Sequence, residues 1–237
     1  MIALDLHIHS KYSFDSLMRT ETILKTARRK GLDIIAITDH GTIEGGLEAS
    51  RLRKTRGMDI GVIVGAEILT NAGDIIGLLL NEEINHKDIG EVIDEIHSQG
   101  GLVLLPHPLK GHEVSTVKAS LSKVDLVELV NSRSPLTTDE MDVVRGFKRK
   151  LVGFSDAHFP SEIGLCRTVM NSSYCPEDID DIRRLLTEAS PVTIKANFSS
   201  SFLVSCSQLI KSVRLKHYRR IPLNALYAIH QVMRNDD

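Results

Sequence analysis

Histidine and carboxylate side chains follow one short apolar segment after another along this sequence of 237 residues. Apolar segments of this kind, rich in β-branched residues, are typical of buried strands. In parallel β/α folds the carboxyl ends of the strands meet on one rim, so these side chains would converge. Imidazole and carboxylate ligands without cysteine suit Zn²⁺, Mn²⁺ or Fe²⁺. The pattern therefore predicts a divalent-metal site, and its strand-end residues are His7, His9, His40, Glu67, His107, Asn131, Asp156 and His158.

Two pairs of these residues occur at a spacing of two. His7 and His9 lie on one face of a strand, because alternate side chains of a strand point the same way. Both imidazoles can therefore bind one cation. Asp5 shares that face one step deeper, and we expect it to accept a hydrogen bond from an imidazole N–H. Asp156 and His158 repeat the arrangement with a carboxylate and an imidazole.

The elements that must position these residues alternate between strands and helices. Strands are expected at residues 3–9, 33–38, 60–64, 75–80, 102–105, 126–130, 152–154 and 165–170, and helices at 20–30, 43–56, 88–99, 137–150 and 177–189. This alternation predicts a parallel sheet or a β/α barrel. Residues 71–74 (Asn-Ala-Gly-Asp) are expected to form a turn between two adjacent strands.

Composition limits the class of protein. With 42% hydrophobic and 25% charged residues the chain is typical of a globular domain. No stretch reaches about 18 uninterrupted apolar residues, so we expect no membrane span. The first five residues do not resemble a signal peptide, and three scattered cysteines suggest a reducing compartment, so the predicted location is cytoplasmic. Aromatic residues make up only 4%, which leaves little for stacking on single-stranded bases.

Basic residues are concentrated at the carboxyl end. Residues 195–237 hold seven basic and two acidic residues, a net charge of +5, whereas the rest of the chain carries −7. Two helices are expected beyond residue 199, with a break near 221–222. Such a basic segment could contact nucleic acid or an acidic partner, or it could be the solvated face of a terminal helix, which is the commoner case.

Five motifs in this sequence resemble those of the PHP family, named after polymerases and histidinol phosphatase. They occur in the family's order at residues 5–10 (Asp-Leu-His-Ile-His-Ser), 37–40 (Ile-Thr-Asp-His), 65–67 (Gly-Ala-Glu), 105–108 (Leu-Pro-His-Pro) and 155–158 (Ser-Asp-Ala-His). The resemblance covers about residues 2–170. It implies a distorted (β/α)7 barrel whose two or three divalent metals hydrolyse phosphate esters. We place this barrel at residues 1–198, with a short helical extension at 199–237 that packs on it and forms no separate domain.

The resemblance also assigns ligands. The first metal would be held by His7, His9, Glu67 and Asp156, the second by Glu67, His107 and Asn131, and the third by Asp15, His40 and His158. Two positions depart from the family pattern. Asn131 replaces a stronger ligand, so the second metal is expected to bind weakly. Asp74 stands where many phosphatase members have a histidine, which weakens an assignment to histidinol phosphate.

These residues predict hydrolysis of a phosphate monoester, in a small metabolite or a nucleotide, by a metal-bound hydroxide. Arg133 is the candidate to grip a phosphate oxygen, and Asp156 or His158 to move a proton to the leaving group. An exonuclease that trims oligonucleotides is the first alternative, which makes nucleic acid a less favoured partner than a small phosphorylated substrate. A non-catalytic metal-binding module is the second. Amidohydrolases also begin with His-x-His, but the lysine that they place at a strand end is missing here.

Overall fold

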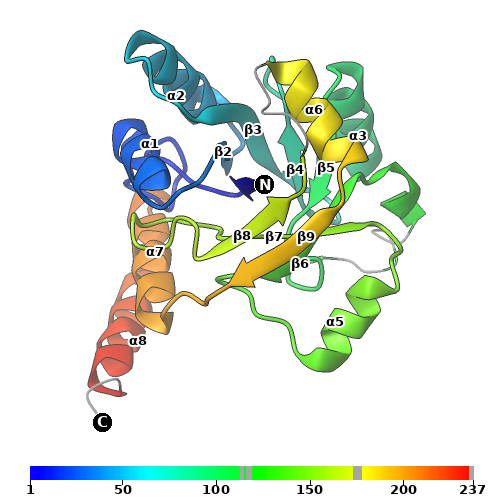
Figure 1. Cartoon of the computed structure of the whole chain (residues 1–237). Coiled ribbons are helices and arrows are strands. Elements are labelled where there is room, and N and C mark those ends of the chain that lie inside the picture. Colours follow the sequence, from blue (N-terminus) through cyan, green and yellow to red (C-terminus); the bar gives the residue numbers. More distant parts are fainter. Residues whose placement is uncertain (113–114, 116–118, 173–177, 235–237) are drawn as a thin grey trace.

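One curved sheet forms the centre of the computed structural model, which describes residues 1–112, 115, 119–172 and 178–234 (Figure 1). Its strands lie in the order β7-β6-β5-β4-β3-β2-β1-β8-β9. The strands are β1 (Ile2–Asp5), β2 (Ile34–His40), β3 (Gly61–Thr70), β4 (Gly73–Leu78), β5 (Leu102–Leu105), β6 (Leu126–Asn131), β7 (Lys150–Phe154), β8 (Cys166–Met170) and β9 (Pro191–Ala196). The helices are α1 (Thr20–Arg29), α2 (Glu44–Thr55), α3 (Ile89–Ser98), α5 (Thr138–Arg145), α6 (Ile179–Glu188), α7 (Ser201–Arg214) and α8 (Ile221–Arg234), with short 3-10 turns η1 (Leu121–Lys123) and η2 (Tyr218–Arg220).

The sheet curls into a nearly closed barrel. Strands β1, β2 and β3 are parallel, as are β5, β6 and β7, whereas β4, β8 and β9 pair antiparallel with their neighbours. Closure brings β7 to β8, where Gly153 N donates to Thr168 Oγ1 (2.8 Å). A Cβ at Gly153 would lie 2.9 Å from Cys166 Sγ of β8 and 2.5 Å from Ile194 Cγ2 of β9, so only glycine allows β7 to approach these strands so closely. The predicted distorted barrel is therefore confirmed, and so is the turn at 71–74, which joins antiparallel β3 and β4.

Several expected boundaries are wrong. The helix expected at 137–150 ends at Arg145, because Gly146 caps it and Lys148 adopts a positive φ of 54° before β7 begins. The first strand ends at Asp5, and beyond it only an isolated parallel bridge joins Ile8 to Ala157. Strand β9 was not expected. It begins with proline and is half exposed at the edge of the sheet, so its apolar pattern is weak.

Helices bury their apolar faces on both the inside and the outside of the curved sheet. α3 begins at the N-cap Asp88, whose side chain accepts from Gly90 N (2.8 Å), and Val92, Ile93 and Ile96 pack against β4 and β5. Inside the barrel, apolar side chains of the strands pack together with Ile182, Leu185 and Leu186 of α6. The packed interior leaves the polar strand ends as the place where a site can form.

The carboxyl-terminal helices lie beside the barrel and are joined to it through α7. Figure 1 shows α7 running past the barrel below α1, with α8 extending away from the sheet. Before α7 begins, Ser199 N donates to Ser132 O (2.9 Å). At its other end, the Arg214 guanidinium donates to the carbonyl oxygens of Lys11 (2.9 Å) and Ser13 (2.5 Å). α7 therefore holds the loop that follows β1.

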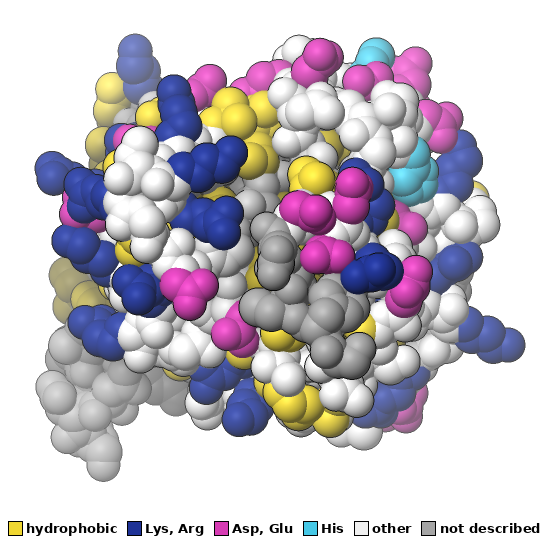
Figure 2. All heavy atoms as spheres, turned by 45° about the horizontal axis from the view of Figure 1, so that its top comes forward, with side chains coloured by type: hydrophobic (Ala, Val, Ile, Leu, Met, Phe, Trp, Pro, Cys, Tyr) yellow, Lys and Arg dark blue, Asp and Glu magenta, His cyan; other side chains and the backbone are white. Residues whose placement is uncertain are grey.

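The outer surface carries charges of both signs. Figure 2 shows basic side chains mostly on the side of α1 and α2, and acidic side chains mostly toward α3 and α6. Among the described helices, none is both long enough and apolar enough to cross a bilayer. Cys166 is buried and Cys206 is partly buried, and both are free thiols, while Cys175 lies outside the described residues.

Candidate metal centre

Glu67 lies at the centre of the predicted site, within β3. Its Oε1 is 3.1 Å from His107 Nε2, and its Oε2 is 3.3 Å from His9 Nε2 and 3.4 Å from both His7 Nε2 and His40 Nδ1. These histidines come from three other strand ends, which the barrel brings to one rim. This position would let one carboxylate be shared by more than one cation, and that role stays a prediction.

Two further carboxylates complete the cluster. Asp156 Oδ1 lies 3.2 Å from His9 Nε2 and 3.5 Å from His7 Nε2. Asp15 Oδ2 lies 3.1 Å from His40 Nε2 and 3.2 Å from His158 Nε2. The ligand atoms fall into three groups, each within 4.8 Å, and these groups are His9-Asp15-His40-His158, His7-His9-Asp156 and His7-Glu67-His107. The groups resemble the three predicted metal positions with three differences: Glu67 is missing from the first, His7 stands in place of Asn131 in the second, and His9 joins the third. That they bind metals stays a prediction.

The donor set fits divalent cations. Both ring nitrogens of His9 and Nδ1 of His107 are buried without a hydrogen-bond partner, which is costly unless a ligand satisfies them. Burial, His158 and His40 lower the pKa of His9 to about 4, so its imidazole is neutral and can donate a lone pair. Burial alone would raise the pKa of Glu67, but the nearby His40 and His7 hold it well below its usual range. Imidazole nitrogens and ionised carboxylates are the ligands expected of Zn²⁺, Mn²⁺ or Fe²⁺. The carboxylates raise the pKa of His40 to about 9, against the effect of burial, so a cation that takes the place of its proton would be attracted by the same carboxylates.

Two of the ligand residues adopt an unusual backbone conformation. His107 has φ of 29° and Asp156 has φ of 53°, in the left-handed region that non-glycine residues rarely occupy. Such conformations cost on the order of 1–3 kcal/mol each and persist where the surrounding structure holds them. At these two positions they turn the side chains toward the shared Glu67 and His9.

Glu128, within β6, is a functional residue that sequence reasoning missed. Its Oε1 lies 2.8 Å from His7 Nδ1, and its Oε2 accepts from His107 N (2.8 Å) and Asn131 Nδ2 (2.9 Å). It thereby fixes the ring of His7, with Nε2 toward the centre. An acidic residue inside the apolar segment 126–131 was the available signal, since a buried carboxylate needs a partner.

The expected bond from Asp5 to an imidazole is wrong. Its carboxylate instead accepts from Ser155 N (3.0 Å), Ser155 Oγ (2.6 Å) and Gly164 N (2.8 Å). Asp39 plays a comparable part for the loop after β1, accepting from Ser10 N (2.5 Å) and Ser10 Oγ (2.6 Å). A Cβ at Gly45 would lie 2.0 Å from Asp39 Oδ2, so glycine lets α2 approach this bond. Both aspartates hold loops that carry ligands.

We expect Glu128→Gln to weaken metal binding by about 10–100-fold, because losing a carboxylate behind a ligating histidine has that effect in other sites. The amide can keep one hydrogen bond to His7 Nδ1 but removes the negative charge that raises the basicity of the ring. Titration of the metal-free protein with Zn²⁺, followed by a competing chelator, measures this. The matched control is Glu91→Gln on the exposed surface of α3, and equal affinities in the two variants would contradict the assignment.

Asn131 is buried beside the cluster. Its Nδ2 donates to Glu128 Oε2 (2.9 Å) and lies 3.5 Å from Asp156 Oδ2, while its Oδ1 accepts from Arg133 N (2.9 Å). The amide therefore contacts residues of the predicted metal site, and a ligating role for it stays a prediction.

Replacing Asn131 by His should strengthen the second metal position, because an imidazole binds Zn²⁺ or Mn²⁺ better than an amide. In the wild-type protein we expect mild chelation to remove one metal equivalent first and to lower turnover while the fold persists. In Asn131→His that equivalent should resist higher chelator concentrations. Metal content measured against chelator concentration tests this, and coinciding curves for the two forms would remove Asn131 from the ligand set.

Arg133 is placed differently from the other predicted residues. Its side chain lines the cavity over the metal cluster, but NH1 donates to both oxygens of the buried Glu162 (2.8 and 2.9 Å) and NH2 donates to Ser207 Oγ of α7. Glu162 also accepts from His158 N (2.8 Å). The guanidinium therefore joins α7 to the loop of a metal ligand, and its proposed grip on phosphate stays a prediction.

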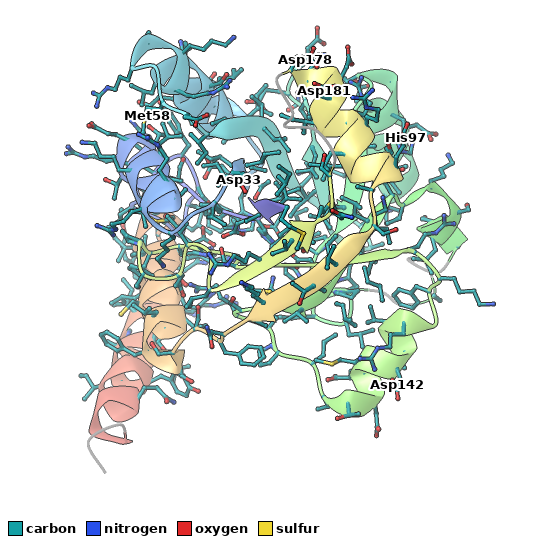
Figure 3. All side chains as sticks on the ribbon, viewed as in Figure 1. Asp33, Met58, His97, Asp142, Asp178 and Asp181 are labelled. Atoms are coloured by element: carbon teal, nitrogen blue, oxygen red, sulfur yellow. The ribbon has the colours of Figure 1, made fainter. Side chains whose placement is uncertain are left out.

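The cavity above the cluster has a volume of about 220 Å³ and opens to solvent. Besides the ligands, its wall contains Asp74, Lys110 and three residues of α7, namely Val204, Gln208 and Lys211. His97, labelled in Figure 3, is on the outer surface of α3 and lies 3.1 Å from Asp125 Oδ2. His112 bonds to the carbonyl oxygens of Lys110 and Asp74.

A distorted β/α barrel with a cluster of imidazoles and carboxylates at the strand ends is typical of metal-dependent hydrolases. The model of the PHP domain matches residues 5–156, and the chain belongs to the PHP domain family. The match includes every predicted ligand except His158, which lies two residues beyond it. The resemblance seen in the motifs is confirmed.

Individual relatives agree with this family. The chain is 47% identical over 116 residues to the uncharacterized protein MJ1587 of Methanocaldococcus jannaschii, which covers 44% of this chain and 66% of that one. Among solved structures, a two-domain Bacteroides vulgatus protein containing a predicted PHP-like metal-dependent phosphoesterase matches with a TM-score of 0.65 and 18% identity, covering 87% of this chain and 69% of the other. The lesion-specific endonuclease PfuEndoQ of Pyrococcus furiosus matches with a TM-score of 0.61 and 18% identity, covering 81% and 58%. At these identities the two structures show the shared fold.

Proposed function

We propose that this chain is a cytoplasmic, divalent-metal-dependent phosphoesterase that hydrolyses a phosphate monoester in a small metabolite or a nucleotide. The observation that carries the proposal is the convergence of three groups of nitrogen and oxygen ligands on Glu67 at the rim of the barrel. Family membership supports the class of reaction, a metal-dependent hydrolysis of a phosphoric ester. Residues 1–198 form the catalytic barrel in this proposal, with 199–237 as an extension of the same unit.

Two or three divalent ions would be held by His7, His9, Asp15, His40, Glu67, His107, Asn131, Asp156 and His158. When bound, they supply polarisation of the phosphoryl oxygens and activation of water at neutral pH. The protein keeps the ligands buried and the carboxylates of Glu67 and Asp156 ionised, which strengthens the electrostatic interactions in the site. His158 Nδ1 lies 2.8 Å from the carbonyl oxygen of Asp156, so a proton on Nδ1 leaves Nε2 free to act as a ligand.

The leaving oxygen of the substrate needs a proton, and Asp156 and His158 are the residues that we propose to handle it. Burial alone would raise the pKa of Asp156, but His7 and the other histidines around it hold it below its usual range. The low pKa keeps Asp156 ionised and makes it a weak proton acceptor, so in this proposal its carboxylate accepts a hydrogen bond from water near the cluster, and His158 beside it (Nδ1 to Oδ1, 3.5 Å) is the group through which the proton moves.

Release of phenolate from an aryl phosphate tests the proposed activity. The metal-depleted protein is supplied with Mn²⁺, Zn²⁺ or Fe²⁺ in separate reactions, and His7→Ala and Asp156→Ala are measured beside the wild type. The matched control is His97→Ala, which removes an imidazole on the outer surface of α3. We expect activity in the wild type and the control only. Activity that survives both site substitutions would overturn the proposal.

An exonuclease acting on oligonucleotide ends is the second candidate. The observation that favours it is the basic segment 195–237, whose helix α7 reaches the wall of the metal cavity. Binding in which lysine and arginine side chains neutralise the phosphates of a nucleic acid weakens steeply as the salt concentration rises. Labelled single-stranded DNA and RNA should then be shortened by the intact protein at low salt and spared at high salt. If neither the DNA nor the RNA is shortened at any salt concentration, the exonuclease candidate fails and the phosphate monoester remains the proposed substrate.

A further inference from the structure

The cavity over the metal cluster has a wall made by the carboxyl-terminal helix, outside the matched family region at residues 5–156. Lys211 of α7 lines that cavity together with Asp15, His40 and Glu67. Its ammonium Nζ lies 4.6 Å from the centre of the Phe14 ring, and Phe14 in turn stacks on His40, with ring centroids 4.4 Å apart and planes at 1°. A cation over an aromatic face is held in place by the ring. Lys211 is therefore linked through the Phe14 ring to His40, a predicted metal ligand.

Lys211 is a half-buried cation in the wall of this cavity. Among the described residues, no acidic group lies within ion-pair distance of it or of Lys110, which stands elsewhere in the wall of the same cavity. Lys110 Nζ donates to the neutral Ser134 Oγ (2.8 Å). Two lysines without acidic partners at the mouth of one cavity are suited to receive an anion.

The helix that carries Lys211 is fixed on the site rather than lying loosely beside it. Arg214 lies three residues after Lys211 in α7. It donates to the carbonyl oxygens of Lys11 and Ser13, in the loop that carries Phe14 and Asp15. In the middle of α7, Ser207 Oγ accepts from the buried Arg133. These two contacts fix α7 on the barrel, so they hold Lys211 at a set distance from the cluster, as a residue that recognises a substrate must be held.

The volume of the cavity indicates what part of a substrate enters it. At about 220 Å³ it is smaller than the roughly 300–1,000 Å³ of pockets that enclose whole small molecules. One phosphoryl group with its first substituents fits among the metal ligands, and the rest of the substrate must extend past the mouth. That extension passes the ammonium groups of Lys110 and Lys211.

We propose that Lys211, with Lys110, forms a second anion subsite at the mouth, so that the preferred substrate carries a second phosphate beyond the one that is hydrolysed. The inference rests on the proposed function and deepens it, because it names what the substrate must carry. Lys211 acts here as a specificity residue for the distal phosphate, and the metal ligands act on the proximal one.

A matched pair of synthetic substrates tests the subsite. Propane-1,3-diol bisphosphate and propane-1,3-diol monophosphate differ only in the distal phosphate. We expect wild-type kcat/KM to favour the bisphosphate, and the ratio of the two values to fall about tenfold in Lys211→Met, because a charge-assisted hydrogen bond is worth about that much. Methionine keeps the apolar stem over Phe14 without the charge. Lys211→Arg should restore most of the ratio, and added salt should lower it in the wild type.

Controls separate recognition from damage to the metals. Metal content of Lys211→Met should equal that of the wild type, and Lys195→Met, on the exposed edge strand β9, should keep the wild-type ratio. An unchanged ratio in an active Lys211→Met overturns the subsite while leaving the proposed function intact. If no form hydrolyses either compound with any of the three metals, the proposed function fails. Calorimetric binding of the bisphosphate then decides the subsite, which requires weaker binding to Lys211→Met than to the wild type.

Discussion

Glu67→Gln is expected to lower turnover of a phosphate monoester by about a thousandfold or more. Metal catalysis supplies several kcal/mol of stabilisation to the transition state, and each factor of ten corresponds to about 1.4 kcal/mol. Glu67 faces His7, His9, His40 and His107 at 3.1–3.4 Å, so removing its charge affects every group of ligands at once. No other carboxylate of the cluster contacts as many imidazoles. The loss should therefore exceed that of Glu128→Gln, which acts only through its neighbours.

Two measurements on Glu67→Gln distinguish loss of metal from loss of fold. The metal content of the purified variant should fall, and its circular dichroism should match the wild type, since glutamine has the same shape. Glu91→Gln on the exposed surface of α3 provides the matched charge change outside the site. A variant that binds the full metal complement and keeps activity within tenfold of the wild type would show that Glu67 is not the shared ligand.

The sequence predicted the site better than it predicted the elements around it. His7, His9, Glu67 and Asp156 meet as expected, because strand order and the period of two determine where side chains at strand ends point. Element boundaries depend on weaker local signals. Strand β9 begins with proline and lies half exposed on the edge, so its pattern did not distinguish it from a loop.

The spacing of residues in the sequence does not predict which side chains from distant segments contact one another. Glu128 and Asp5 are both acidic residues within buried strands, yet Glu128 bonds to His7 whereas Asp5 bonds to Ser155 and Gly164. Which carboxylate reaches an imidazole depends on how the barrel closes, and the sequence carries no local signal for that. The ion pair of Arg133 with Glu162 was not predicted for the same reason, since the two residues are 29 positions apart and meet only in the folded barrel.

Arg133→Met is expected to lower the free energy of unfolding by about 3–5 kcal/mol, the usual result of breaking a buried ion pair from one side. The side chains of Arg133 and Glu162 are 4% and 0% exposed, so the substitution leaves a carboxylate without its partner and without water. It also removes the bond to Ser207 that holds α7. Urea denaturation at fixed metal concentration measures the change. Arg145→Met breaks an exposed pair with Asp142 and should cost no more than about 1 kcal/mol.

Combining Arg133→Met with Glu162→Gln separates the structural role of this arginine from the proposed grip on phosphate. The oxygen of the neutral amide can still accept from His158 N, and its nitrogen can donate to Ser199 Oγ, so no uncompensated charge remains buried, and the double variant should be more stable than Arg133→Met alone. If Arg133 also holds the substrate, KM for the monoester should stay raised in the double variant although stability returns. If KM returns together with stability, Arg133 acts only through the Glu162 pair, and the phosphate must be held by the metals and the lysines at the mouth.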